Sequence, residues 1–263
     1  MTFFSIIKKN KIKLFVVVFF LLLFYLTLAF QNQIFKFWFS SKIWAHRVNS
    51  IEKYEEARTV FSGVELDIVY NTLENNFDVN HPPAESINLT LFDFLSSKKE
   101  YQDFGIWLDF KNLNTSNHQQ AANKLDTLVK TLSINPTNII VESTEPVLLD
   151  LFSKKGFKTS YYLPINISSF SKEDLIIQSE FINDLTSSGS IDFISSHIKD
   201  YTFLKENFPN SKIITWIINS PPKIKSLYTL KRSMILFKRN FKVLRDENIE
   251  VVLYKFNASQ GNR

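Results

Sequence analysis

Three short apolar runs that end in charged residues most constrain how this chain can fold. The runs end in Ala45-His46-Arg47, Val64-Glu65-Leu66-Asp67 and Trp107-Leu108-Asp109-Phe110-Lys111. Apolar runs of this kind are typical of parallel strands that are buried on both faces. A barrel of parallel strands brings the residues at the carboxyl ends of its strands to one common face. We therefore expect these charged side chains to meet at one end of a barrel.

Strand and helix signals alternate along the rest of the chain. The expected strands are Ile43–His46, Gly63–Val69, Gly105–Lys111, Asn138–Glu142, Thr159–Leu163, Ile191–Ser195, Lys212–Ile218 and Ile249–Tyr254. The expected helices are Ser50–Thr59, Leu89–Ser97, Asn117–Thr131, Pro146–Lys155, Ser171–Ser187, Ile198–Asn207 and Ser226–Glu247. This alternation predicts the α/β class and a single (β/α)8 TIM barrel. The alternative is an open doubly wound sheet, but no glycine-rich loop follows the first strand.

An uncharged apolar run, Leu14–Phe30, precedes the barrel sequence. As a helix, ~17 residues reach about 26 Å, the short end of a membrane span. Lysines before the run predict a cytoplasmic N-terminus, so the barrel of this single-pass membrane protein is expected on the extracytoplasmic side. The alternative is a cleaved signal peptide, which would leave a secreted or periplasmic protein.

We expect four regions along the chain. They are a basic cytoplasmic tail (1–13), a transmembrane anchor or signal segment (14–30), a linker (31–41) and the barrel domain (42–263). After the first 40 residues, about 220 remain, which fits one barrel of ordinary size and not two full domains. Because the chain has no cysteine, it can form neither a disulfide nor a lipoprotein anchor.

The net charge of +5 comes largely from the N-terminal lysines and a second basic stretch, Lys223–Lys242. Spacing of three to four residues between its cations is typical of an amphipathic helix with a solvated basic face, which could lie near anionic lipid. No basic array interleaved with aromatics and no nucleic-acid motif is present, so a nucleic-acid partner is not expected.

Carboxylates on two of the expected strands are candidate metal ligands. Glu65 and Asp67 are two residues apart, so their side chains share one face of a strand. If that face is the barrel interior, the negative charges need compensation, which a hard divalent cation can provide. Asp109 lies within an apolar strand and needs a partner for the same reason. The alternative is that Lys111 pairs with Asp109 and that no metal is bound.

Two of the four histidines, His46 and His81, follow expected extended segments. Imidazole titrates near neutral pH, so two histidines across one site can act as general acid and general base. A single histidine at a strand end is more often a hydrogen-bonded structural residue. We assign no role to His118 or His197, which lie at a polar helix start and a strand-to-helix turn.

Glu142 and Trp216 also lie near the ends of expected strands and are candidate substrate contacts. Trp216 could cover an apolar part of a substrate, although an aromatic residue in a barrel is more often part of the core. At the start of the first helix, Asn49 with Glu52 three residues later is similar to a capping box.

The chain resembles the menorin family in an ordered set of segments. These are Trp44-Ala45-His46-Arg47-Val48-Asn49-Ser50, Val64-Glu65-Leu66-Asp67, His81-Pro82-Pro83-Ala84 with Thr90-Leu91, and Gly105-Ile106-Trp107-Leu108-Asp109-Phe110-Lys111. That family belongs with the phospholipase-C-like phosphodiesterases. The same segments are more distantly similar to glycerophosphodiester phosphodiesterases, and Ile214–Asn219 is similar to their late W-T-V-N strand. Val48 stands where those enzymes have the glycine of H-R-G.

The resemblance implies a metal-dependent phosphodiester hydrolase of the glycerophosphodiester or lysophospholipid type, acting on a small phosphodiester or phospholipid-derived molecule. It implies His46 and His81 as the acid/base pair, Glu65, Asp67 and Asp109 as ligands of Mg²⁺ or Ca²⁺, and Arg47 and Lys111 as phosphate contacts. It also implies that a neighbouring hydroxyl of the substrate attacks phosphorus. The alternative is a non-catalytic exported binding domain that keeps the barrel.

Overall fold

The computed structural model describes residues 3–97, 104–218 and 221–257. The chain forms two compact units. The N-terminal unit comprises Met1–Phe39 and Ser220–Val243, and the barrel unit comprises Ser40–Asn219 and Leu244–Arg263. The barrel unit differs from the expected domain of residues 42–263, because residues 220–243 group with the N-terminal helices.

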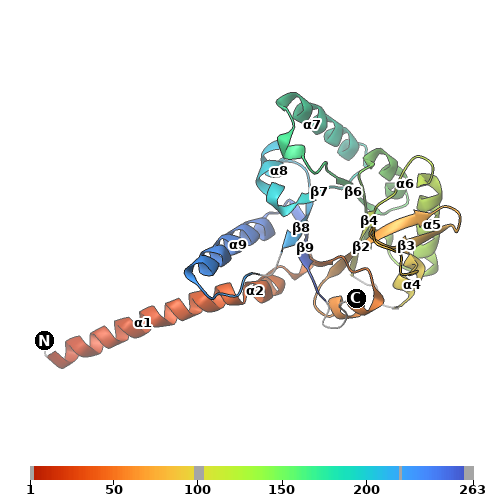
Figure 1. The fold of residues 1–263 in the computed structure, drawn as a ribbon. Coiled ribbons are helices and arrows are strands. Elements are labelled where there is room, and N and C mark those ends of the chain that lie inside the picture. The colour runs from red at the N-terminus through yellow and green to blue at the C-terminus, as the bar shows by residue number, and fades with distance from the viewer. Residues whose placement is uncertain (1–2, 98–103, 219–220, 258–263) are drawn as a thin grey trace. The chain divides into compact units, whose positions relative to one another are not determined.

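Eight parallel strands form a closed ring in the barrel unit, which confirms the predicted TIM barrel (Figure 1). They are β1 (Ile43–His46), β2 (Gly63–Asn71), β4 (Gly105–Phe110), β5 (Ile139–Ser143), β6 (Lys158–Tyr162), β7 (Phe193–His197), β8 (Ile213–Ile218) and β9 (Ile249–Lys255). The ring closes because β1 pairs with both β9 and β2. Each strand overlaps an expected one, because every run is apolar enough to be buried on both faces.

A further strand, β3 (Asn76–Val79), pairs antiparallel with the end of β2. We expected only a short extended segment here. The pairing is possible because β2 continues past the barrel to Asn71, and a turn with Asn75 at φ 50° reverses the chain. Asn80 N–H then donates to the Asp67 carbonyl at 3.1 Å. This hairpin brings the segment that contains His81 back to the carboxyl end of the barrel.

Helices surround the ring of strands in the barrel unit (Figure 1). They are α3 (Ile51–Ala57), α4 (Leu91–Ser96), α5 (His118–Thr131), α6 (Asp150–Ser153), α7 (Lys172–Ser187) and α8 (Tyr201–Asn207). The expected cap of the first of these helices was wrong. Ser50, not Asn49, caps α3, because its hydroxyl accepts the Lys53 N–H at 3.2 Å. The Asn49 side chain is engaged elsewhere, as described below.

The floor of the barrel is filled by the indole of Trp44, which β1 points inward. Gly63 and Gly105 face this ring from β2 and β4. A Cβ added at Gly63 would lie 2.4 Å from Trp44 Cδ2, and one at Gly105 would lie 2.0 Å from Trp44 Cζ2. Real side chains cannot approach so closely, so two of the five glycines are required by this packing. The floor beneath the site is therefore rigid and apolar.

The N-terminal unit contains α1 (Phe3–Ala29), α2 (Gln31–Trp38) and most of α9 (Leu227–Arg245). Within α1, Ile12–Ala29 is long and apolar enough to cross a membrane, a property that signal sequences share. The expected linker of residues 31–41 is helical over α2. Its Phe35 is buried and stacks on Phe237 of α9, with ring centroids 5.2 Å apart.

Candidate functional site

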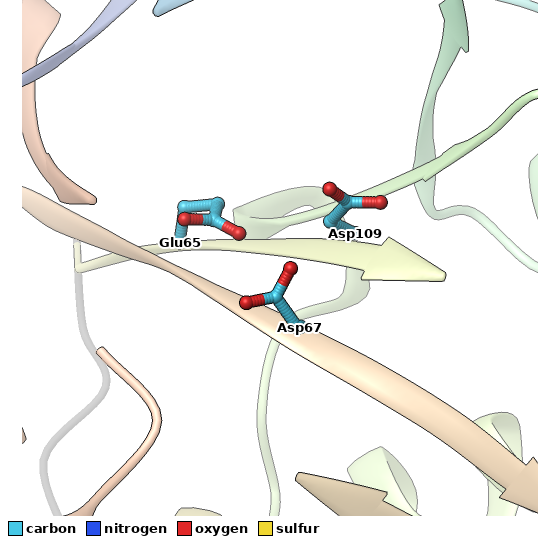
Figure 2. A group of neighbouring side chains, drawn as sticks. All are labelled: Glu65, Asp67 and Asp109. Atoms are coloured by element: carbon cyan, nitrogen blue, oxygen red, sulfur yellow. The ribbon is translucent and has the colours of Figure 1, made fainter. Parts of the chain in front are cut away.

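Three carboxylates gather at the carboxyl ends of β2 and β4 (Figure 2). Glu65 and Asp67 are two residues apart on β2 and therefore share its inner face. Asp109 is the register partner of Asp67 on the neighbouring β4. One oxygen from each group lies within 4.8 Å of the others, and the Glu65 and Asp67 side chains are almost fully buried. The strand ends thus bring the three expected ligand residues together.

The three carboxylates of this cluster lie close together in a part of the barrel that is shielded from water. Burial, with repulsion from Asp67 and Asp109, holds the pKa of Glu65 well above its usual range. Burial also raises the pKa of Asp109, although the charge of Lys111 partly offsets this effect. Both shifts mean that the ionised carboxylates are destabilised and that a further positive charge would be favourable at this position.

Lys111 lies between two of the three carboxylates. Its Nζ is 2.8 Å from Asp67 Oδ1 and forms a very short contact with Asp109 Oδ2. Burial alone would lower the pKa of Lys111, but the charges of Asp109 and Asp67 outweigh it and raise the pKa above its ordinary value. The ion pair between Lys111 and Asp109, which the sequence offered as the alternative to a bound metal, is thus present, and it extends to Asp67.

His46 faces the cluster from β1. Its Nε2 lies 3.7 Å from Glu65 Oε2, and only 14% of the side chain is exposed. Burial, followed by the positive charge of Arg47, lowers the pKa of His46 to about 4. The imidazole is consequently neutral at neutral pH and has a free lone pair for a proton.

Arg47 takes a left-handed backbone conformation, with φ 54°. Its N–H donates to Glu65 Oε2 at 2.7 Å, and Lys53 Nζ donates to its carbonyl, which together hold the unusual turn. Val48, at the position where the resembling H-R-G pattern has a glycine, is fully buried and donates its N–H to the Glu65 carbonyl. Because Arg47 carries the positive φ, position 48 does not need glycine.

His81 approaches the cluster from the segment after β3. Its Nε2 lies 3.9 Å from Asp67 Oδ1 and 2.9 Å from Arg47 Nη2. Arginine can only donate, so the His81 Nε2 accepts this hydrogen bond, and the His81 Nδ1 donates to the Pro82 carbonyl at 2.9 Å. This arrangement describes a neutral His81 that carries its proton on Nδ1.

Asn49 belongs to the site, although sequence analysis treated it as a helix cap. Its Nδ2 donates to Asp67 Oδ2 at 2.8 Å, and its Oδ1 accepts the Asp67 backbone N–H at 3.0 Å. The paired hydrogen bonds fix the orientation of the Asp67 carboxylate towards the cluster. One signal in the sequence could have predicted this role. Asn49 lies two residues after Arg47, within the segment Trp44–Ser50 that resembles the menorin family.

The cluster lines a cavity of about 120 Å³ that also contains both candidate substrate contacts. Trp216 on β8 packs edge-on against Tyr162 of β6, with ring centroids 5.0 Å apart. Glu142 on β5 is buried and accepts the Ser160 hydroxyl at 3.4 Å. Burial and the nearby Asp109 raise the pKa of Glu142 well above its usual range. The far wall of the cavity thus combines aromatic rings with a buried carboxyl group.

Trp107 is a second residue that sequence analysis did not single out for the site. It lines the cavity from the inner face of β4, directly below Asp109. Its indole Nε1 is buried and has no hydrogen-bond partner among the described residues. An unpaired buried donor costs free energy, so Trp107 lines the site at a cost to the stability of the fold.

The other two histidines lie away from this cavity. The His118 Nδ1 is 2.9 Å from the Thr115 carbonyl at the start of α5. The His197 Nδ1 accepts the Lys199 N–H at 3.0 Å and caps a short 3₁₀ turn after β7. These local hydrogen bonds account for both histidines without a role in the site.

The chemistry of the donor set fits a hard divalent ion. Carboxylate oxygens from Glu65, Asp67 and Asp109 are the ligands that Mg²⁺ and Ca²⁺ prefer. The raised pKa of Glu65 and of Asp109 shows that Lys111 compensates the cluster only in part. A divalent ion would remove the remaining repulsion. The three residues therefore form a buried acidic triad that could hold such an ion.

Solved structures of phosphodiesterases share this fold. A glycerophosphodiester phosphodiesterase from Parabacteroides distasonis aligns with a TM-score of 0.54 at 16% identity, covering 82% of this chain and 92% of that chain. A phosphodiesterase from Oleispira antarctica, solved with its product sn-glycerol-3-phosphate, aligns with a TM-score of 0.52 at 11% identity, covering 83% and 94%. At these identities the likeness establishes the fold, which is the TIM barrel of the glycerophosphodiester phosphodiesterases.

A more particular match comes from the sequence itself. Residues 40–142 match the Menorin N-terminal domain, which confirms the resemblance predicted from the segments around His46, Glu65 and Asp109. The matched region runs from the start of the barrel unit to Glu142 and contains the acidic triad, both candidate histidines and Lys111. No curated protein matches the chain.

Proposed function

We propose that this protein is a metal-dependent phosphodiester hydrolase that acts on small glycerophosphodiesters or lysophospholipid headgroups. The observation that carries the proposal is the convergence, in one cavity, of three carboxylates, two histidines and two cations. Carboxylates suit a hard metal, imidazoles suit proton transfer, and Arg47 and Lys111 suit a phosphate. The Oleispira antarctica phosphodiesterase of the same fold holds sn-glycerol-3-phosphate, the phosphomonoester that hydrolysis of a glycerophosphodiester yields.

In this proposal Glu65, Asp67 and Asp109 hold Mg²⁺ or Ca²⁺. When bound, the ion polarises the phosphoryl oxygens and stabilises the charge that develops on them. Asn49 keeps the Asp67 carboxylate in place through its two hydrogen bonds. Lys111 would remain beside the carboxylates and present its ammonium group to the phosphate.

His46 is our candidate for the general base. Its pKa of about 4 leaves the imidazole neutral at neutral pH, so it can take a proton from the attacking hydroxyl of the substrate. The oxygen of that hydroxyl forms the new bond to phosphorus.

His81 is the complementary candidate for the general acid. The new bond displaces the alcohol, whose oxygen takes a proton from His81 as the P–O bond breaks, and a cyclic phosphodiester remains. Water then attacks this ester and gives a proton to His81, while His46 returns its proton to the ring oxygen that leaves, so that the ring opens to a phosphomonoester. His81 is the more exposed histidine, and its Nε2 currently accepts a hydrogen bond from Arg47. We propose that Arg47 moves to the phosphate when substrate binds, which frees the His81 Nε2 to carry the proton it transfers.

The far wall of the cavity would hold the alcohol part of the substrate. The buried carboxyl of Glu142, which lines the cavity, can hydrogen-bond to hydroxyl groups. Trp216 and Tyr162 would cover the carbon chain. The same cavity would hold the phosphate beside Arg47 and Lys111.

The decisive test is turnover of a panel of phosphodiesters by the full chain with added Mg²⁺, Ca²⁺ or Mn²⁺. We expect metal-dependent release of the alcohol from glycerophosphodiesters, and loss of this release in both His46→Ala and His81→Ala. The matched control is His118→Ala, which removes a histidine outside the cavity and should turn over normally. Wild-type turnover in either site variant contradicts the acid/base assignment.

A specific observation supports a second candidate function, an exported binding domain without catalysis. Lys111 already pairs with Asp67 and Asp109, which compensates two of the three carboxylates without a metal. In that case a phosphate-containing ligand would bind to Arg47 and the rest of the cavity would recognise it. Ligand binding that survives both histidine substitutions, with no turnover of any phosphodiester, supports this alternative.

We further propose that α1 anchors the protein in a membrane and that the barrel lies on the extracytoplasmic side. The support is the apolar segment Ile12–Ala29 and the lysines that precede it. Cleavage of the same segment as a signal peptide would instead release the barrel. N-terminal sequencing of the mature protein distinguishes the two outcomes.

A further inference from the structure

Helix α9 carries positive charge without any compensating acid of its own. Its 19 residues include six cations and no aspartate or glutamate. The cations are Lys231, Arg232, Lys238, Arg239, Lys242 and Arg245. A solvent-exposed helix normally mixes both signs, because pairs of opposite charge three or four residues apart stabilise it. Of these cations, Lys231, Arg232 and Lys238 are exposed and can meet negative charge outside the chain.

Exposed apolar residues share the basic face of α9. Lys231, Ile235, Lys238 and Lys242 follow one another at intervals of three and four residues, so they line one side of the helix, and all are exposed. Ile235 is 68% exposed, and Tyr228, two turns earlier, is 71% exposed. Basic residues interleaved with exposed apolar ones are typical of helices that lie in the interface of a bilayer.

Aromatic contacts hold α9 against α2 within the N-terminal unit. Phe237 stacks on Phe35, and Phe241 packs edge-on against Phe39 with ring centroids 6.2 Å apart. α2 begins two residues after α1 ends, so Phe35 lies only about 9 Å further along the chain if the helical rise continues. The polar headgroup layer extends about 5–7 Å beyond the hydrocarbon core. A membrane-spanning α1 would therefore place Phe35, and the part of α9 that stacks on it, at the outer edge of the headgroup layer.

Two large aromatic side chains of α2 are also exposed next to these contacts. Phe37 is 79% exposed and Trp38 is 73% exposed. Tryptophan and other aromatic residues are enriched at the membrane–water interface, where the ring is only partly desolvated. Their exposure in the same unit agrees with an interfacial position for α2.

We propose that α9 and α2 form a membrane-docking surface that is selective for anionic phospholipids. Lys231, Arg232 and Lys238 would contact the headgroups, while Tyr228 and Ile235 would enter the interface. This surface is distinct from the cavity of the barrel and does not depend on its proposed chemistry. Each cation near an anionic surface favours the docked state about fivefold, so three of them favour it on the order of 100-fold.

The absence of cysteine in the chain allows a direct test. We would introduce Ile235→Cys in the full chain, attach an environment-sensitive fluorophore and insert the protein into lipid nanodiscs with brominated acyl chains. In nanodiscs that contain phosphatidylglycerol, we expect quenching of the fluorophore that high salt reverses. In nanodiscs of phosphatidylcholine alone, quenching should be weak. Leu73→Cys is the control, because Leu73 is 96% exposed at the β2–β3 turn of the barrel unit.

A charge variant completes the test. Lys231→Gln, Arg232→Gln and Lys238→Gln together keep good helix formers and should lower the ratio of docked to undocked protein on the order of 100-fold. A second fluorophore at Tyr228→Cys, on the same helix, should show the same quenching. This control tests whether the label at position 235 itself changes the docking. Equal quenching in neutral and anionic nanodiscs, or wild-type quenching in the triple variant, contradicts the proposal. Protection of both labels only by an added acidic protein also contradicts it and indicates a protein partner.

Discussion

The low pKa of His46 predicts a pH-dependent loss of stability that can be measured without substrate. In the folded chain the pKa is about 4, against an ordinary value of 6.5. Folding therefore excludes a proton that the unfolded chain binds, so this contribution to the free energy of unfolding is present above pH 6.5 and is lost as the pH falls towards 4. A shift of this size corresponds to about 3 kcal/mol at pH 4. The side chain is only 14% exposed, so solvent screening reduces the figure little.

The perturbation is His46→Gln, which keeps a polar side chain of similar length but cannot titrate. The assay is urea unfolding of the full chain in detergent with a chelator, followed by tryptophan fluorescence, at several pH values between 7 and 4. We expect the wild type to lose about 3 kcal/mol more than His46→Gln over this range. The matched control His118→Gln should keep the wild-type dependence on pH.

Two results would refute this reasoning. If the wild type and His46→Gln lose stability in parallel as the pH falls, His46 binds a proton equally well in the folded and the unfolded chain. Burial would then not lower the pKa of His46. If the wild type becomes relatively more stable as the pH falls, the carboxylate of Glu65 outweighs burial and Arg47. In either case His46 would no longer be preferred over His81 as the general base.

Three further predictions follow from the same contacts. Saturating Mg²⁺ or Ca²⁺ at a hundred times its Kd should stabilise the protein by about 2.7 kcal/mol, which raises Tm by roughly 5–10 °C in differential scanning fluorimetry. Asp109→Asn should abolish this increase in Tm, whereas the control variant Asp126→Asn, outside the cavity, should keep it. If the wild type responds to no divalent ion, Lys111 alone compensates the charge of the carboxylates. Gly105→Ala should destabilise the barrel by about 1–3 kcal/mol through overpacking against Trp44; urea unfolding should show less loss in a Trp44→Leu background, and equal losses in both backgrounds contradict the packing argument. Each single histidine variant, His46→Ala or His81→Ala, should lower turnover about 10²- to 10⁴-fold, and kinetics of the double variant should show much less than the product of the two losses, because the residues act in one step.

Local patterns in the sequence were sufficient to place the strands of the barrel. The apolar runs are buried on both faces, and this property depends on composition over a few residues, so β1 matches its expected bounds and the other strands shift by only one or a few residues. The spacing of Glu65 and Asp67 placed both on one face for the same local reason. Closure of the ring then brought Asp109 to Asp67, as expected for carboxyl ends of parallel strands.

Contacts between distant segments could not be read from these patterns. The pairing of β3 with β2 brings His81 to Asp67, and it depends on a hairpin that extends beyond the barrel. Asn49 was mistaken for a cap, because an asparagine before a helix fits that role locally, whereas only the fold reveals Asp67 as its partner. The free N–H of Trp107 is likewise invisible in a sequence, since a missing partner is a property of the surrounding structure.

The sequence by itself therefore determined the barrel, the apolar N-terminal helix and the set of residues able to do chemistry, because each follows from short-range composition and period. Only the tertiary structure decided how those residues share charge and hydrogen bonds. Lys111 divides its contacts between two carboxylates, and Arg47 holds both Glu65 and His81. These choices depend on distances of a few ångströms between side chains from different strands. Such distances are set when the ring of strands closes.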